Sequence, residues 1–366
     1  MPSLDDCRRS ADEILGHSGG TAEYYGSDSS KSEKTEKERP RRTESPKLVS
    51  VTLHDLLSRE LPRLDPIISP WLGTQSLNMV YAWRGVGKTH FALNVAYAAA
   101  SGGEFLGWTA EKPHGVLYLD GEMPGAAMQE RLSSIILASD KECDPDNFRV
   151  VTPDLQTSFM PDLATGEGQD AIEEHITDST RLIVVDNLSA LVRRGGRENE
   201  AESWLNVAEW AMYQRARGRS VLFVHHAGKN GAQRGTSKRE DILDCVICLR
   251  RPGDYDPATD GARFEVHFEK DRHNAAGSPF EARLETDRDG RQVWTVRNLE
   301  QSRADQVIAL HDLGMSVTDI ATELNMHKSN VCRAIKKATE EGKIAPRKKS
   351  HHTEPKQPRR RRDVDD

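Results

Sequence analysis

Apolar and polar positions alternate in regular blocks between about residues 66 and 228. Short runs that are almost wholly apolar predict strands buried on both faces of a sheet, and longer runs with helical spacing predict helices between them. The predicted strands are SLNMVYAW, GVLYLDGE, FRVVTP, RLIVVDN and SVLFVHHAG, and the predicted helices are THFALNVAYAAASGG, AAMQERLSSIILAS, QDAIEEHIT and ESWLNVAEWAMYQRARG. This alternation predicts an α/β fold with a mostly parallel sheet and helices on both faces.

The pattern changes after Gly228, where shorter segments of strand character follow one another. Turn-rich stretches, DYDPATDG and DRDG, separate several of them. This spacing predicts short antiparallel strands that extend the sheet. The segments are ILDCVICLRR, ARFEVHFEKDR, FEARLETD and RQVWTVRN, and we expect the whole α/β domain to span residues 48–299.

Both ends of the chain have a composition that disfavours folding. The stretch from Gly16 to Lys47 is rich in Ser, Gly, Glu, Lys and Arg, so apolar burial cannot offset the entropy of ordering it. We expect a disordered segment over residues 1–47 and a basic disordered tail over residues 345–366. The tail either touches phosphates or is simply solvated. Its basic residues are Arg347, Lys348, Lys349, Lys356 and Arg359 to Arg362.

The overall charge and hydropathy exclude two classes of protein. The net charge of −7 excludes a polycation that coats nucleic acid by bulk charge, so any contact with DNA must be local. No apolar run approaches the roughly 20 residues that a membrane helix needs, and MPSLDDCRRS lacks the apolar stretch of a signal peptide. We therefore expect a cytoplasmic protein without a membrane partner.

Five scattered cysteines argue against a disulfide framework. Cys245 and Cys248 have the spacing of a metal or redox pair, but they lie in a predicted strand. Residues three apart in a strand face opposite sides of the sheet, so a shared metal is geometrically awkward. We interpret both as core residues.

The segment AWRGVGKT lies between a predicted strand and a predicted helix, and it fits the pattern G-x-x-x-x-G-K-[ST] except that alanine replaces the first glycine. Glycines let backbone N–H groups surround a phosphate, the lysine reaches the β and γ oxygens, and the Thr hydroxyl binds Mg²⁺. The sequence therefore predicts a P-loop that binds ATP and Mg²⁺. Its residues are Ala82, Trp83, Arg84, Gly85, Val86, Gly87, Lys88 and Thr89.

Two carboxylates follow apolar strands, at positions where ATP hydrolysis needs an acidic group. Asp186 ends the run Leu182 to Val185, where a second acidic group holds Mg²⁺; the alternative is an ordinary strand-end aspartate. Glu122 follows the strand Val116 to Leu119, where a carboxylate can orient the attacking water.

Together, YAWRGVGKT, LDGEM, LIVVDN, VHH and RGTS resemble the RecA-like RepA group of hexameric plasmid replicative helicases, which is related to DnaB and KaiC. The resemblance covers about residues 66–298. It implies a homo-hexameric ring in which Glu122 is the catalytic glutamate, with Asp120 as the alternative residue for that role. It also implies that His226 senses the γ-phosphate. The alternative is a strand-end histidine with only a structural hydrogen bond. Arg234 resembles an arginine finger, with Lys270 and Arg272 as rivals.

In such rings, loops after the central strands contact single-stranded DNA. The corresponding stretches here are Arg193 to Asn199 and Lys229 to Lys238. Flexibility and positive charge suit phosphate contacts, although the first stretch has no aromatic residue for base stacking. A plain surface loop is the alternative.

Residues 303–344 change character and predict three short helices. The expected inner residues are Val307, Leu310, Leu313, Ile320, Ala321, Leu324, Val331 and Ile335, and Ser316 can cap the second helix. This segment resembles the helix-turn-helix of resolvases and bacterial regulators. That resemblance implies that the third helix binds duplex DNA, although such units also dock proteins. The candidate DNA-binding residues are Lys328, Ser329, Asn330 and Arg333.

These features predict a Mg²⁺-dependent ATPase that acts on DNA, of the RepA helicase type, from a plasmid or other mobile element. Two alternatives remain open. One is an ATP-controlled DNA-binding regulator or initiator that does not unwind DNA. The other is a KaiC-like ATPase that acts on a protein partner.

Overall fold

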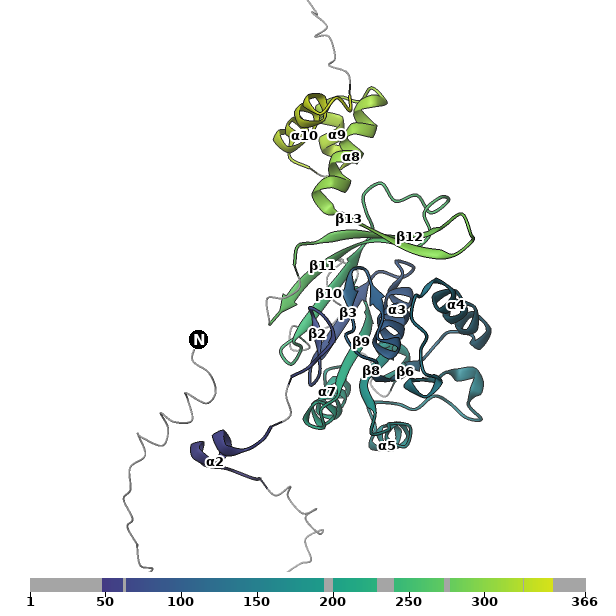
Figure 1. The fold of residues 1–366 in the computed structure, drawn as a ribbon, viewed down its shortest axis with the longest axis vertical. Helices are drawn as coiled ribbons and strands as arrows, with labels where there is room; N and C mark the ends of the chain where they lie inside the picture. The colour runs from purple at the N-terminus through teal and green to yellow at the C-terminus, as the bar shows by residue number, and fades with distance from the viewer. Residues whose placement is uncertain are drawn as a thin grey trace, which may run out of the picture. The chain divides into compact units, whose positions relative to one another are not determined.

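A computed structural model describes residues 48–61, 64–193, 200–228, 240–272, 277–324 and 326–344 (Figure 1). The chain divides into two compact units, residues 1–63 and 64–366. In the first unit, the described part contains one short helix, α2 (Leu53–Ser58), and none of its residues is buried. Thr52 caps this helix by accepting a hydrogen bond from the backbone N–H of Asp55 at 3.1 Å. The rest of the described structure belongs to the second unit.

A nine-stranded sheet dominates the described part of the second unit, with the strand order β13-β12-β11-β10-β3-β9-β8-β6-β7 (Figure 1). Its strands are β3 (Leu77–Ala82), β6 (Gly115–Asp120), β7 (Phe148–Val151), β8 (Thr180–Asp186), β9 (Ser220–His226), β10 (Cys245–Arg250), β11 (Arg263–Asp271), β12 (Phe280–Thr286) and β13 (Gln292–Asn298). Two small antiparallel pairs lie outside it, β1 (Pro66–Ile68) with β2 (Leu72–Gly73) and β4 (Glu104–Phe105) with β5 (Trp108–Thr109).

The pairing confirms a mostly parallel sheet with an antiparallel extension. Strands β10, β3, β9, β8, β6 and β7 are mutually parallel, whereas β11, β12 and β13 pair antiparallel. One expectation was wrong, because β10 was predicted to be antiparallel and instead runs parallel to β3. The chain leaves β9 and returns on the far side of β3 in the same direction. The antiparallel part therefore starts one strand later, between β10 and β11.

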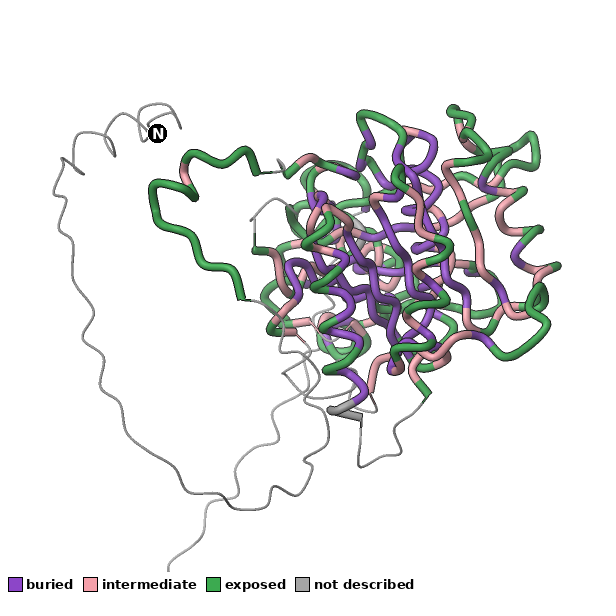
Figure 2. Tube along the Cα trace, turned by 90° about the horizontal axis from the view of Figure 1, so that it is seen from below, coloured by how far each residue is buried: buried purple, intermediate pink, exposed green. Residues whose placement is uncertain are grey.

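Helices connect the parallel strands, as the alternation predicted. They are α3 (Lys88–Ser101), α4 (Gly125–Ala138), α5 (Gly166–Glu173), α6 (Leu188–Leu191) and α7 (Glu200–Ala216), with short 3₁₀ turns η1 (Pro145–Asn147) and η2 (Pro153–Leu155). Figure 2 shows that the buried residues gather in the middle of this α/β part.

Alternate residues of each central strand supply two separate cores. In β3, Val80 and Ala82 pack with α3, whereas Met79 and Tyr81 pack with the α7 side. Strand side chains alternate between faces with a period of two, so a strand between two helical layers is apolar at most of its positions. Cys245 and Cys248 follow the same rule, because one lies in each core. Their predicted placement on opposite faces is confirmed.

The last described segment forms three helices, α8 (Leu299–Asp312), α9 (Val317–Glu323) and α10 (Lys328–Glu340). Val307, Ile320, Ala321 and Val331 form its small core, and Ser316 caps α9 by accepting from the N–H of Asp319. The prediction for Leu313 was wrong, since its side chain is 80% exposed. Leu313 is the C-cap of α8, so the helical periodicity that predicted its burial ends there. No helix in the described ranges is long and apolar enough to cross a membrane.

Phe91 anchors the α3 side of the core and provides a test of the fold. Its ring is fully buried and meets Phe105, Trp108 and Phe264 edge to face, with ring centroids 5.5, 5.9 and 6.2 Å away. We expect Phe91→Ala to lower the free energy of unfolding by about 3–5 kcal/mol, measured by urea denaturation. The control Phe159→Ala removes a ring that is 91% exposed and should change the value by less than about 0.5 kcal/mol. Equal losses in both variants would contradict this account of the core.

Candidate nucleotide-binding site

Four parallel strands bring their carboxyl ends together at one edge of the sheet. Ala82 of β3 lies opposite His226 of β9, and Asp120 of β6 lies opposite Asp186 of β8. Asp186 in turn lies opposite Val224 of β9. The carboxyl edge of a parallel sheet is where ligands of α/β proteins bind. The register therefore makes this edge the candidate site.

The loop between β3 and α3 contains the predicted P-loop. Gly85 and Gly87 have φ angles of +75° and +118°, a backbone region that side chains disfavour. A Cβ atom at Gly87 would also approach the Phe264 ring to 3.2 Å. The two glycines allow the tight turn that joins strand to helix, and α3 begins at Lys88.

Lys88 is nearly buried and points back across the loop. Its exposed fraction is 7%, and its Nζ donates hydrogen bonds to the carbonyl oxygens of Ala82 at 3.2 Å and Trp83 at 3.0 Å. Loss of hydration lowers its pKa to about 8, although Asp186 and Glu122 act in the opposite direction. The loop thus holds a poorly hydrated ammonium group, which an anionic ligand would stabilise.

Asp186 and Thr89 together offer oxygen atoms suited to Mg²⁺. The Asp186 side chain is buried, and its Oδ2 accepts a hydrogen bond from the Tyr118 hydroxyl at 2.7 Å. Burial raises the pKa of Asp186, while hydrogen bonds from Tyr118 and Thr89 oppose that shift. A carboxylate beside a hydroxyl matches the hard oxygen ligands that Mg²⁺ prefers, and Mg²⁺ commonly takes only one or two protein ligands. Among the described residues, no group of three or more His, Cys, Asp or Glu side chains is arranged so that it could hold a metal ion by itself.

Glu122 lies at the rim of the site, with its side chain 59% exposed. The side-chain amide of Asn187 donates a hydrogen bond to its Oε1, and Nε2 of His226 lies 3.7 Å from the same oxygen. Burial lowers the pKa of His226, and nearby Lys88 adds to this effect. The two predicted residues are therefore neighbours, which the sequence separation of more than a hundred positions did not show.

Asp120 has a different environment from Glu122. It is 1% exposed and accepts hydrogen bonds from the backbone N–H of Met123 at 3.1 Å and the Thr152 hydroxyl at 3.2 Å. Burial raises its pKa to about 6. Its oxygens hold the turn that presents Glu122, so the geometry favours Glu122 over Asp120 for contact with a ligand.

The other predicted site residues fall into three groups. Arg234 and the stretches 194–199 and 229–238 lie outside the described residues. Lys270 donates to the carbonyl of Glu240, and Arg272 donates to Asp244 at 3.0 Å, so both rivals have partners within the chain. On α10, the four candidate DNA-binding residues Lys328, Ser329, Asn330 and Arg333 are all exposed.

Sequence reasoning missed three residues at the site. Asn187 directly follows Asp186 and could have been suspected from its position. Tyr118 lies inside an apolar strand, and Arg251 approaches the P-loop from a distant loop, donating to the carbonyl of Gly85 at 3.1 Å. No local pattern marks either of these two.

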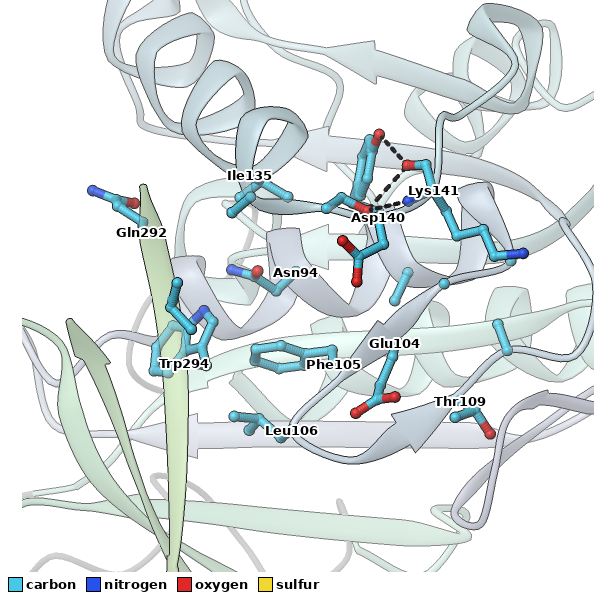
Figure 3. Close-up of a pocket in the computed structure, with 18 of the residues that line it drawn as sticks. Asn94, Glu104, Phe105, Leu106, Thr109, Ile135, Asp140, Lys141, Gln292 and Trp294 are labelled. Atoms are coloured by element: carbon cyan, nitrogen blue, oxygen red, sulfur yellow. Dashed lines mark hydrogen bonds between the residues drawn. The ribbon is translucent and has the colours of Figure 1, made fainter. Parts of the chain in front are cut away.

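A separate cavity of about 500 Å³ lies beside the C-terminal half of α3, the β4–β5 hairpin and β13 (Figure 3). Phe105, Leu106, Ile135 and Trp294 line it together with Asn94 and Lys141. None of the P-loop residues belongs to its lining. It is therefore distinct from the nucleotide site.

Residues 40–232 match the family model of the AAA domain, over more than half of the chain. The chain belongs to this family. The matched region contains the P-loop, Glu122, Asp186 and His226, so the candidate site lies in an ATPase domain and its expected ligand is a nucleotide. No curated protein matches the chain.

Among solved structures, the AAA-domain chain is distantly similar to the RadB recombinase, with 15% identity, a TM-score of 0.41, and coverage of 58% of this chain and 88% of that one. A KaiC-like protein from the archaeon Pyrococcus horikoshii OT3 has 15% identity, a TM-score of 0.43, and coverage of 65% and 98%. The ATPase domain of G40P has 14% identity, a TM-score of 0.41, and coverage of 60% and 84%.

The lowered pKa of Lys88 predicts a pH effect on stability. Between about pH 8 and 10.5 the unfolded chain binds this proton more tightly than the folded protein, so stability rises with pH in that window. In Lys88→Met this contribution is absent. We expect the wild type to gain about 1–3 kcal/mol relative to Lys88→Met between pH 7 and 10, measured by urea unfolding without nucleotide. Parallel pH profiles of the two proteins would contradict a buried, charged Lys88.

Proposed function

We propose that the protein is a Mg²⁺-dependent ATPase that acts on DNA, of the RepA type of hexameric replicative helicase. The observation that carries the proposal is the convergence of Lys88, Asp186, Thr89 and Glu122 at one edge of the sheet. A cation, two Mg²⁺-binding oxygens and a partly exposed carboxylate are the groups that phosphoryl transfer from ATP to water requires.

Each group has a role that its surroundings support. The backbone of Ala82 to Thr89 would surround the phosphates, and Lys88 would exchange its two carbonyl partners for phosphate oxygens. Thr89 and Asp186 would hold Mg²⁺, which when bound neutralises charge on the β and γ phosphates. Glu122 would orient the attacking water and accept its proton, while Asn187 keeps the carboxylate in place.

His226 is suited to report on this chemistry because it lies 3.7 Å from Glu122 at the end of β9. A shift of Glu122 on hydrolysis would change the environment of His226 and of the chain that follows it. Under the proposal, that following stretch and the one after Val192 contact single-stranded DNA inside a ring. Arg234 would then complete the site of the neighbouring subunit.

We propose that residues 48–299 form the ATPase domain and that residues 303–344 form a helix-turn-helix that binds duplex DNA. The exposed polar start of α10 supports this role, because side chains at the N-terminal end of such a helix can reach base edges and phosphates. The same feature also supports the second candidate function, an ATP-controlled DNA-binding regulator that does not separate strands.

Steady-state ATP hydrolysis with no DNA, single-stranded DNA or duplex DNA discriminates between these functions, together with the particle mass measured by light scattering in ATP. Strong stimulation by single strands in a six-subunit particle supports the helicase. Stimulation by duplex alone supports the regulator. No stimulation by either DNA favours an ATPase that acts on a protein partner.

The roles of Lys88 and Glu122 can be separated. We expect Lys88→Ala to weaken ATP binding more than about 100-fold, because it removes the buried cation of the phosphate site. Glu122→Gln should keep binding within about threefold and lower kcat at least about 100-fold. Fluorescent-nucleotide titration and phosphate release measure the two effects, with Lys112→Ala as a surface control. Full activity of Glu122→Gln would remove this residue from the catalytic role.

The third helix can be tested without deleting any element. Arg333→Ala should weaken binding of duplex DNA about five- to tenfold at moderate salt and leave ATP hydrolysis without DNA unchanged. Arg288→Ala, which removes the same charge from an exposed turn between β12 and β13, is the control. Fluorescence anisotropy with labelled duplex measures both. Equal DNA affinity in the two variants would favour docking of a protein on α10.

A further inference from the structure

A loop far from the P-loop in sequence reaches it in the fold. Arg251 directly follows β10, and its Nη2 donates a hydrogen bond to the carbonyl oxygen of Gly85 at 3.1 Å. The same guanidinium lies over the ring of Tyr255, 4.5 Å from the ring centroid. The stacking contact and the hydrogen bond together restrict the orientation of the Arg251 side chain.

Tyr255 is itself fixed within the loop. Its hydroxyl lies 3.2 Å from the carbonyl oxygen of Asp260 and 3.3 Å from that of Gly261, to which it donates. The side chain of Asp260 accepts a hydrogen bond from the backbone N–H of Asp256 at 3.1 Å. The loop is thus closed on itself by polar contacts and presents Arg251 on a rigid support.

A buried arginine anchors this support to the sheet. Arg263, at the start of β11, is only 9% exposed, and its guanidinium contacts Asp254 at 3.0 Å, Asp260 at 3.0 Å and Glu281 at 3.2 Å. Asp254 also accepts a hydrogen bond from the side-chain amide of Gln306 at 2.8 Å. Gln306 belongs to α8, so one ion cluster connects the loop, the sheet and the first C-terminal helix.

The contact with Gly85 bears on phosphate binding because of peptide geometry. In a trans peptide, the carbonyl of one residue and the N–H of the next point in opposite directions. A guanidinium that holds the Gly85 carbonyl therefore also fixes the direction of the Val86 N–H. Gly85 has a φ of +75° and no side chain to restrict it, so a contact from outside the loop adds a restraint that the residue itself lacks.

We propose that Arg251 is a positioning residue of the nucleotide site, which orients the Gly85–Val86 peptide, and that the cluster around Arg263 links this function to α8. The inference rests on the proposed binding of ATP at the P-loop. A pre-oriented peptide lowers the ordering cost of binding, so the contact acts on nucleotide affinity more than on the chemical step.

Arg251→Gln tests the proposal against a closely matched control. Arg250→Gln removes the same charge one residue earlier and breaks an ion pair with Glu269 at 2.8 Å, but leaves the P-loop contact intact. We expect Arg251→Gln to raise the Kd and KM for ATP about five- to tenfold and change kcat less than about twofold. Arg251→Lys, which retains a charged donor, should recover part of the affinity. Equal effects of Arg251→Gln and Arg250→Gln would overturn the proposal.

Amide hydrogen exchange of the nucleotide-free protein separates this inference from the proposed function. Peptides that cover residues 82–89 should exchange faster in Arg251→Gln than in the wild type and in Arg250→Gln. If the wild type binds no nucleotide but this difference is seen, the proposed function fails and the positioning contact stands. If the wild type binds ATP and exchange is the same in all three proteins, only the inference fails.

The link to α8 has its own test. Gln306→Ala removes the amide that contacts Asp254 and leaves every P-loop residue in place. We expect a weaker effect in the same direction, a two- to threefold rise in the Kd for ATP, because the lost hydrogen bond acts on the P-loop only through the cluster around Arg263. In Arg251→Gln, the added Gln306→Ala change should have no further effect on affinity. Independent, multiplicative effects of the two substitutions would refute the link.

Discussion

The site depends on one constraint, the parallel register of β3, β9, β8 and β6 between two helical layers. Because both faces of these strands are covered, their interiors are mostly apolar, and the charged side chains of the site lie where the strands end. The register places Ala82 beside His226 and Asp120 beside Asp186. Groups from distant parts of the chain are thereby gathered at one edge, where the chain turns and backbone amides are not used in the sheet.

Partial burial then changes the chemistry of these groups. Lys88 and Asp186 have both lost most of their hydration, which disfavours their charged forms, and each partly compensates the other. Tyr118 holds the Asp186 carboxylate from within the sheet at 2.7 Å. These two poorly hydrated charges cost stability in the free form, and an anionic ligand with its metal ion would satisfy both at once.

The antiparallel extension of the sheet also contacts the P-loop. It places Phe264 against Gly87 and holds the loop that brings Arg251 to Gly85. Arg263 keeps that loop in position, because its buried guanidinium bonds Asp254 and Asp260 of the loop as well as Glu281 of β12. Hydrogen bonds and ion pairs thus connect the antiparallel extension and α8 to the loop that contacts Gly85.

The sequence by itself determined the parts of this protein that follow local rules. Alternation of apolar runs and helical segments was enough for the α/β fold. The spacing of Gly85, Gly87 and Lys88 was enough for a phosphate loop, and Ser316 was enough for a helix cap. These features depend only on residues that are a few positions apart in the chain, so the sequence is sufficient to predict them. Periodicity failed at Leu313, where the helix ends.

Tertiary structure alone decided which distant residues meet. The parallel direction of β10, the pairing of Glu122 with Asn187 and His226, and the approach of Arg251 to Gly85 all depend on the order of strands in the sheet. Strand order is set by how the two cores pack, which is a property of the whole chain. No local pattern of residues encodes it, and for that reason the sequence could point to residues such as Glu122 and His226 but not to the contacts between them.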